Sequence, residues 1–467
     1  MADCRRLYDL RLATIDWRVP DAELVGEVRA ALEGVPRVAY SVPHVYPSAA
    51  PAYDSAPELE RPAADRADLR LYVHLPYCSY RCSFCYFSVK VGAQREAMER
   101  YVGALQRELQ WVPPGSRLNQ LFVGGGTPTK LPADLLDDVL GSVFGRVARE
   151  GQHVHTIETS PETISPEHLD VILDHGIGRI SMGIQSLVPD VLETVHRGHE
   201  VRQAIEACEL LVASGLVVNV DLIYGLPGQT PASFLADLTT LAGLGVPAIT
   251  CYSLRVTERT AVSRAIGHEP FDLEQIMAWR AFVKEAAESL GYTQTRWHTF
   301  KRMDTVAAKH ERMPCFDDTL HGFQLGVGMS ARSHLGHAVY RNHPVHDAYI
   351  QRIEEERSPV QEVFRFDDDD RRTQFVARSL GDGNPLVRAE YGAVFGHPIE
   401  QDFGALLERL RRGGLLDDDG EALALSARGK LVYDLVTLAF YPERAQKWLD
   451  SHESTAAFVS AEPLLSS

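Results

Sequence analysis

The sequence has little positive charge and no long apolar run, and each shortage excludes a class of protein. Its 467 residues include 47 Lys and Arg against 64 Asp and Glu, which gives a formal net charge of −17. A general nucleic-acid binder needs a basic surface for phosphate contacts, and no stretch concentrates Lys and Arg in that way. No run approaches the roughly twenty apolar residues of a membrane span. We therefore expect neither a nucleic-acid partner nor a membrane segment.

Disulfide and secretion patterns are missing as well. The chain has seven cysteines, an odd number, and four of them stand singly at Cys4, Cys208, Cys251 and Cys315. Such usage does not form a disulfide framework and suits a reducing compartment. The opening run, MADCRRLYDLRL, lacks the apolar core of a secretory signal. These observations predict a cytoplasmic protein.

The other three cysteines lie close together in the run LYVHLPYCSYRCSFCYF at residues 71–87. Cys78, Cys82 and Cys85 follow a short strand-like segment that Pro76 ends, and the C-x3-C-x2-C spacing lets three thiolates converge on one metal centre. Structural zinc takes four protein ligands, and no C-x2-C or H-x3-H pair elsewhere completes such a site. An iron–sulfur cluster with one iron left open fits better. A zinc site or a purely packing role is the alternative.

From residue 71 onward, short apolar runs alternate with longer helical segments, which is typical of parallel βα units. Strands are predicted at residues 71–75, 120–123, 154–159, 179–184, 217–222 and 248–254. Helices are predicted near residues 96–109, 132–144, 166–175, 201–214 and 230–244. Parallel strands with right-handed crossovers close into a full or partial barrel. The predicted fold class is therefore α/β, a partial or full parallel (β/α) barrel.

The predicted barrel and its extension occupy residues 68–360. Before it, residues 1–67 combine amphipathic segments with Pro- and Ala-rich segments, which predicts an irregular N-terminal extension. After it, residues 361–450 predict a small C-terminal winged-helix-like α+β module, and residues 451–467 a frayed tail.

The C-terminal prediction depends on two turn signals. A helical stretch stops at Gly413-Gly414, and a short hairpin then turns at Asp419-Gly420 before a closing helix. Acidic residues flank this module, which favours a packing or lid role over DNA binding.

Polar residues alternate with apolar ones in two of the predicted strands. Ser181, Gly183 and Gln185 occupy one face at 179–184, and Asn219 and Asp221 occupy the corresponding face of the next strand. A barrel packed shut would be filled by branched apolar side chains, so a polar inward face predicts a cavity for a polar ligand.

Glycine-rich turns and histidines add weaker signals. The turn GGGTPT at 124–129 lets backbone groups reach a ligand, although it lacks the G-x-x-x-x-G-K-[ST] phosphate-loop pattern. The run FQLGVGMSARS at 323–333 allows another close approach. Residues 255–350 hold histidines whose spacing matches no single metal site: His298, His310, His321, His334, His337, His343 and His346.

Six motifs occur in one order along the chain: YVHLPYCSYRCSFC, GGGTPT at 124–129, IETSP at 157–161, RISMGIQS at 179–186, HRGHE at 196–200 and DLIYGLPGQT at 221–230. In these motifs the chain resembles the radical S-adenosylmethionine (radical SAM) superfamily, and within it the oxygen-independent coproporphyrinogen III oxidase branch. The resemblance covers residues 71–441.

The resemblance implies that Cys78, Cys82 and Cys85 hold three irons of a 4Fe-4S cluster, while SAM chelates the fourth. An electron from the cluster would cleave SAM to a 5′-deoxyadenosyl radical that abstracts hydrogen. The resemblance also implies a set of residues that contact one or two SAM molecules: Tyr72, Phe84, Gly125, Gly126, Thr127, Glu158, Gln185, Arg197 and Asp221.

One departure from the branch concerns the reaction. Oxidases of this type carry a further cysteine two positions after the third ligand, where this chain has Phe87. Relatives that methylate or cyclopropanate natural-product precursors use two SAM molecules, and we expect this reaction here, on an unsaturated carbon. The alternatives are porphyrinogen decarboxylation and non-catalytic haem delivery by a chaperone, whose branch also lacks that cysteine.

The expected partners are a small-molecule substrate and an electron donor such as flavodoxin or ferredoxin. The sequence assigns no catalytic residue, substrate or oligomeric state.

Overall fold

The computed structural model describes residues 20–36, 54–55, 68–149, 154–256, 260–263, 273–309, 323–335 and 338–451. The predicted tail and most of the predicted N-terminal extension lie outside these ranges, as do His310, His321 and His337.

The centre of the molecule is one mixed sheet in which six parallel strands are neighbours in chain order. They are β2 (Asp68–Leu75), β5 (Arg117–Gly125), β6 (Thr156–Thr159), β7 (Arg179–Gln185), β8 (Val217–Tyr224) and β9 (Ala248–Ser253). All six predicted strands are confirmed, and so is the α/β class.

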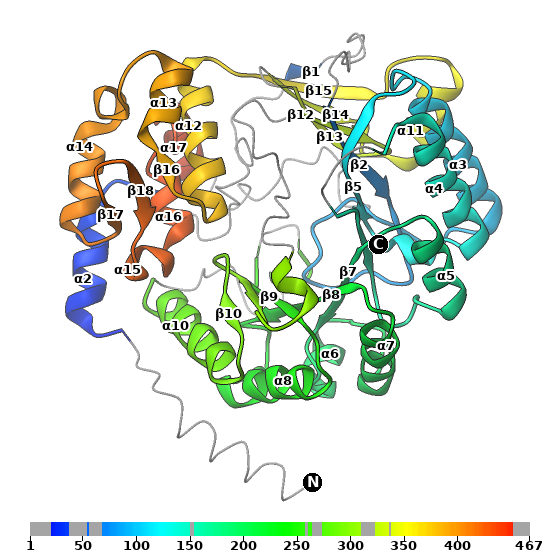
Figure 1. Ribbon diagram of the computed structural model, residues 1–467, viewed down its shortest axis with the longest axis horizontal. Helices are drawn as coiled ribbons and strands as arrows, with labels where there is room; N and C mark the ends of the chain where they lie inside the picture. Colours follow the sequence, from blue (N-terminus) through cyan, green and yellow to red (C-terminus); the bar gives the residue numbers. More distant parts are fainter. Residues whose placement is uncertain are drawn as a thin grey trace, which may run out of the picture.

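Helices cover the outer side of these strands (Figure 1). They include α3 (Arg95–Leu109), α4 (Ala133–Arg146), α5 (Pro166–Asp174), α7 (Val201–Ala213), α8 (Pro231–Gly243) and α10 (Leu273–Ser289). The short helix α6 (Pro189–Thr194) instead packs with Ile223 and Leu254, at the ends of β8 and β9. Local chemistry sets their starts. The Ser165 hydroxyl accepts from His168 N–H with Pro166 in the first turn, and Thr230 and Ser233 form a capping box ahead of α8.

The barrel is partial, because other strands extend the sheet at both ends instead of closing it. Beside β2 lies the parallel strand β12 (Phe323–Val327), followed by the antiparallel β13 (Arg332–Leu335), β14 (Ala338–Asn342), β15 (Val360–Arg365) and β1 (Asp54–Ser55). Beside β9 lie the antiparallel β11 (Thr299–Lys301) and β10 (Thr293–Gln294). Between β14 and β15, α11 (His346–Glu354) packs on α3.

The C-terminal module matches the predicted winged-helix-like pattern. Its helices are α12 (Asp368–Ser379), α13 (Arg388–Phe395), α14 (Ile399–Arg412), α15 (Ala427–Lys430), α16 (Tyr433–Leu438) and α17 (Glu443–Ser451). Its three-stranded sheet has the order β16 (Leu386–Val387), β18 (Ala422–Leu425), β17 (Leu416–Asp418). The strands β17 and β18 form the predicted hairpin.

The prediction of an irregular N-terminal extension is wrong for α2 (Ala22–Ala31), which the Asp21 side chain caps through Leu24 N–H. Its apolar face, with Val25, Val28 and Ala31, is buried in the core of the C-terminal module, beside α14 in Figure 1. Because this face is covered by residues almost 400 positions away, the helix is stabilised by a contact that the local sequence does not contain.

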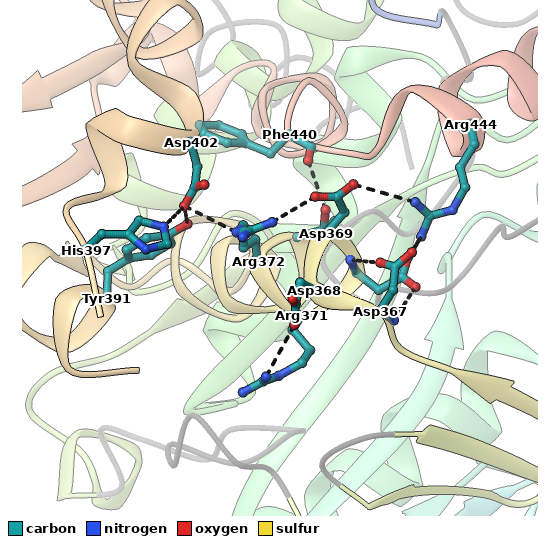
Figure 2. A network of polar contacts seen from close by, with 12 residues as sticks. Asp367, Asp368, Asp369, Arg371, Arg372, Tyr391, His397, Asp402, Phe440 and Arg444 are labelled. Carbon is teal, nitrogen blue, oxygen red and sulfur yellow. Dashed lines mark hydrogen bonds and ion pairs between the residues drawn. The ribbon is translucent and has the colours of Figure 1, made fainter. Parts of the chain in front are cut away.

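The acidic run at the start of α12 is paired inside the module (Figure 2). The Asp367 carboxylate caps the helix by accepting from Asp370 N–H at 2.9 Å. Arg444 forms ion pairs with the carboxylates of Asp367 (2.9 Å) and Asp370 (2.5 Å). Arg372 lies between Asp369 (2.8 Å) and Asp402 (3.3 Å). These acids therefore serve in contacts between α12, α14 and α17.

The module is joined to the barrel by a buried ion pair. Arg280 of α10 donates to both carboxylate oxygens of Asp434, at 2.9 and 2.7 Å, and to the Leu431 carbonyl at 2.8 Å. Trp297 Nε1 donates to the Gly381 carbonyl at 2.7 Å. Among the described residues, no helix has the length and apolar character needed to cross a membrane.

Candidate functional site

The three clustered cysteines lie in the loop that follows β2, at the carboxyl end of the parallel strands. The loop is closed where β3 (Tyr77–Cys78) pairs with β4 (Lys90–Val91) and Lys90 N–H donates to the Pro76 carbonyl at 2.8 Å. Cys85 N–H donates to the Cys82 carbonyl at 3.1 Å, which forms a tight turn. The three cysteines therefore lie in one short, closed loop.

The chemistry of these thiols fits an iron–sulfur cluster. Burial raises the pKa of Cys78 to about 12 and also raises the pKa of Cys85, so without a metal both remain neutral. Among the described residues, no three ligand side chains form a ready-made site for a single metal ion. A cluster differs from a single ion because each thiolate binds a different iron, and the three sulfurs need not meet at one point.

The turn after β5 approaches this loop so closely that it requires glycine. A Cβ on Gly126 would lie 2.6 Å from the Pro76 carbonyl oxygen and 2.7 Å from the Tyr77 carbonyl oxygen, both of which are backbone atoms of the loop. Thr127 N–H donates to the Tyr77 carbonyl at 2.7 Å, and its hydroxyl lies 3.8 Å from Cys78 Sγ. The cysteine loop and the glycine turn therefore form one unit.

Next to the turn, β6 and β8 contribute two carboxylates. Glu158 accepts a hydrogen bond from Gly125 N–H at 3.2 Å, and Asp221 accepts from Ser181 Oγ at 3.1 Å and Asn219 Nδ2 at 2.8 Å. Burial raises the pKa of Glu158 to about 7, with a further contribution from Asp221, whose own pKa burial raises to about 6. Two acids in such surroundings favour a cationic ligand, because it would offset the cost of ionising them.

The strict alternation predicted for β7 fails at its end. Gln185 has a positive φ of 75°, and the pairing with β8 shifts between Gly183 and Gln185, so a bulge turns the Gln185 side chain back over Gly183. Arg197 donates to the Gly183 carbonyl and, through Nη1, to Cys82 Sγ at 3.4 Å. Gln185 and Arg197 are therefore brought together beside the cysteine loop.

The two predicted aromatic residues lie in different surroundings. Tyr72 stacks on Phe122 with ring centroids 6.0 Å apart, donates to or accepts from His74 Nδ1 at 3.1 Å, and is close enough to Glu158 to be affected by its charge. Phe84 packs against an apolar cluster that contains Leu254. Tyr72 thus belongs to the polar group of residues, whereas Phe84 supports the loop.

Four further residues at the same end of the barrel were not predicted as site residues: Tyr86, Tyr252, Arg255 and His298. Tyr86 directly follows Cys85, and Tyr252 lies close to the end of β9. Arg255 follows β9 and His298 precedes β11, so no spacing in the sequence links the four residues. Their proximity becomes visible only in the fold.

The radical SAM superfamily model matches residues 72–241. This segment is similar to radical SAM domains. Such domains use a 4Fe-4S cluster and SAM, and they act with a small-molecule substrate and a reductant. The cysteine loop, the glycine turn, Glu158, Gln185, Arg197 and Asp221 all lie within the matched segment.

Relatives extend over most of the chain. It is 25% identical over 381 residues to the haem chaperone HemW of Bacillus subtilis, covering 80% of this chain and 99% of that one. It is 26% identical over 400 residues to the oxygen-independent coproporphyrinogen III oxidase of Escherichia coli, covering 81% and 86%. The solved structure of coproporphyrinogen III oxidase (HemN) from E. coli matches with a TM-score of 0.72 and 24% identity, over 85% of this chain and 96% of that one.

These relatives correct the predicted reaction. The expectation of a methylase or cyclopropanase is wrong, because the similar full-length proteins are named as haem chaperones or coproporphyrinogen oxidases. The physical reason is that Phe87 only removes one thiol from the oxidase pattern. A missing side chain does not specify which other chemistry takes its place.

Proposed function

We propose that this protein is a haem-binding radical SAM protein of the chaperone type, in which Cys78, Cys82 and Cys85 hold a 4Fe-4S cluster. The observation that carries this proposal is Phe87. Its ring is half exposed and lies 4.6 Å from the Tyr86 ring, centroid to centroid, at the position where the oxidases carry a cysteine. An exposed aromatic pair beside the cluster loop offers a flat apolar surface, which suits a porphyrin face.

The cofactor roles rest on the geometry of the described side chains. When bound, the cluster and SAM together supply a reductively generated radical. Gly125, Gly126 and Thr127 would lie against the methionine end of SAM. Glu158 and Asp221 would accept hydrogen bonds from its amino and hydroxyl groups.

Gln185 and Arg197 complete the proposed SAM site at the carboxylate of the ligand, since both carry N–H donors beside the cysteine loop. Tyr72 and the ring of Phe122 form one wall. Phe84 holds the loop in place through its apolar contacts and excludes water from that side. A flavodoxin or ferredoxin is the proposed electron donor.

The test is a titration of the reconstituted protein with haem under anaerobic conditions. We expect saturation at one haem per chain, by absorbance, without stoichiometric release of 5′-deoxyadenosine. Absence of haem binding by the cluster-loaded protein would overturn the chaperone proposal.

A second candidate is porphyrinogen oxidation, which the complete polar group around Glu158 and Asp221 favours, because a protein that only carries haem has less need of it. Its test is anaerobic incubation with coproporphyrinogen III, SAM and a reductant. Decarboxylated product formed together with 5′-deoxyadenosine would establish the oxidase. The Phe87→Cys variant provides a comparison, since it restores the oxidase pattern at one position.

A further inference from the structure

We propose that Arg255 binds a carboxylate of a flat macrocyclic ligand, which lies between two aromatic pairs at the open end of the barrel. This inference rests on the proposed function and assigns its ligand site to residues that no sequence motif includes.

Arg255 lies two positions after the end of β9, and its Nη1 is 3.4 Å from the Tyr86 hydroxyl in the cysteine loop. Among the described residues, no carboxylate forms an ion pair with it. Two buried arginines elsewhere in the fold differ, since Arg280 is paired with Asp434 and Arg341 with Glu362. Among the described residues, the hydrogen-bond partner of this half-buried guanidinium is the Tyr86 hydroxyl, so further N–H donors remain for an anion.

The first aromatic pair is Tyr86 and Phe87, with their rings inclined by 33°. The second is Tyr252 and His298, whose ring centroids are 5.1 Å apart and whose rings are inclined by 29°. Phe87 and Tyr252 are 50% and 40% exposed, which is unusual for large aromatic side chains and leaves both pairs able to stack on a ligand.

Backbone contacts hold the two pairs on one rim. Cys251 N–H donates to the His298 carbonyl at 2.7 Å, so His298 lies level with the end of β9. Val262 N–H donates to the Ser83 carbonyl at 2.9 Å, which ties the segment after β9 to the cysteine loop. Phe84 packs with Leu254 in the same apolar cluster. The rim is therefore a single surface, with Arg255 between its two sides.

The ligand chemistry follows from this arrangement. Aromatic side chains stack on planar conjugated ligands, and a guanidinium binds a carboxylate through paired N–H donors. Burial lowers the pKa of His298 to about 3, so its ring is neutral and adds no second positive charge at pH 7. The rim accordingly fits a planar macrocycle with few carboxylates, such as haem.

The experiment compares haem with its dimethyl ester, which has the same ring and no carboxylate. Arg255→Gln should weaken haem binding about tenfold and leave ester binding unchanged, since a charge-assisted pair contributes about that factor. Tyr252→Leu should weaken both ligands equally. Arg302→Gln is the matched control, because Arg302 lies at the opposite end of β9 from Arg255. Its backbone N–H donates to the Pro247 carbonyl there.

Arg255→Lys distinguishes loss of the ligand contact from a folding defect. It keeps the positive charge and should therefore bind haem with an affinity between those of the wild type and Arg255→Gln. If wild-type protein binds haem and Arg255→Gln binds it equally well, the Arg255 assignment is overturned and the chaperone proposal stands. If haem is not bound but coproporphyrinogen III is decarboxylated, a raised KM in Arg255→Gln supports the assignment while the chaperone proposal falls. If neither ligand is bound or consumed, both proposals fall.

Discussion

Arg197 donates a hydrogen bond from Nη1 to Cys82 Sγ over 3.4 Å. Its guanidinium also lies 5.6 Å from the centroid of the Tyr80 ring and donates to the Gly183 carbonyl. The contact was not expected, because the resemblance assigns Arg197 to SAM alone. A fixed cation at a cluster thiolate stabilises the reduced cluster, which carries the more negative charge.

Arg197→Gln should therefore lower the midpoint potential of the cluster. Loss of a charged hydrogen bond of about 1–2 kcal/mol corresponds to roughly 40–90 mV for a one-electron couple. Arg197→Lys should lie between this variant and the wild type, because it retains the charge without the forked donors. An optical redox titration without SAM measures the potential; equal potentials in all three proteins would refute the tuning role.

Replacement of Cys78, Cys82 or Cys85 by Ala should abolish the cluster. Each change removes one of the three proposed ligands, so iron content and visible absorbance should fall to near background after reconstitution. The matched control is Cys208→Ala, since Cys208 is fully buried in α7 and away from the loop. A full cluster in any of the three variants would show that the ligand set is different.

SAM affinity should decrease as the pH falls from about 8 to about 6. The pKa values of Glu158 and Asp221 are about 7 and about 6, so acidification removes the negative charge that faces a cationic ligand. Glu158→Gln should bind SAM about tenfold more weakly at pH 8 and show a flatter profile. Asp137→Asn, on the exposed side of α4, is the control, and equilibrium dialysis is the measurement. A profile that is the same in Glu158→Gln and in the wild type would exclude Glu158 from the site.

The sequence predicts the parts of this molecule that depend on local pattern. The periodicity of apolar residues gives all six parallel strands, because each is buried and bounded by turn residues. The C-x3-C-x2-C spacing and GGGTPT likewise lie within single loops. The proximity of those two loops follows from parallel topology, which brings the carboxyl ends of neighbouring strands to one edge.

Contacts between distant residues are what the sequence does not contain. Arg255 and Tyr86 are 169 positions apart, and α2 packs on a module that begins more than 300 residues later. The bulge at Gln185 also escapes the alternation pattern, because it depends on how β7 pairs with β8 and on the side chain of Arg197. In each case the deciding interaction is tertiary.

Asp237 is a buried carboxyl in α8. It accepts a hydrogen bond at 2.8 Å from the hydroxyl of Ser186, the residue directly after Gln185. Burial raises its pKa to about 7 from the ordinary value of 3.8. The folded protein therefore keeps a proton that the unfolded chain has released, and this contribution to stability is complete below pH 4 and is lost as the pH rises to about 7.

Asp237→Asn should remove that pH dependence, because the amide cannot ionise and its oxygen still accepts from Ser186. At pH 8 we expect the variant to be more stable than the wild type, by at most about 4 kcal/mol, since three pKa units correspond to that limit. Thermal unfolding between pH 5 and pH 8 measures the effect. Asp237→Ala should not be stabilised, because it leaves the Ser186 hydroxyl without its acceptor and creates a small cavity. Parallel curves of melting temperature against pH for the wild type and Asp237→Asn would show that Asp237 does not titrate in this range.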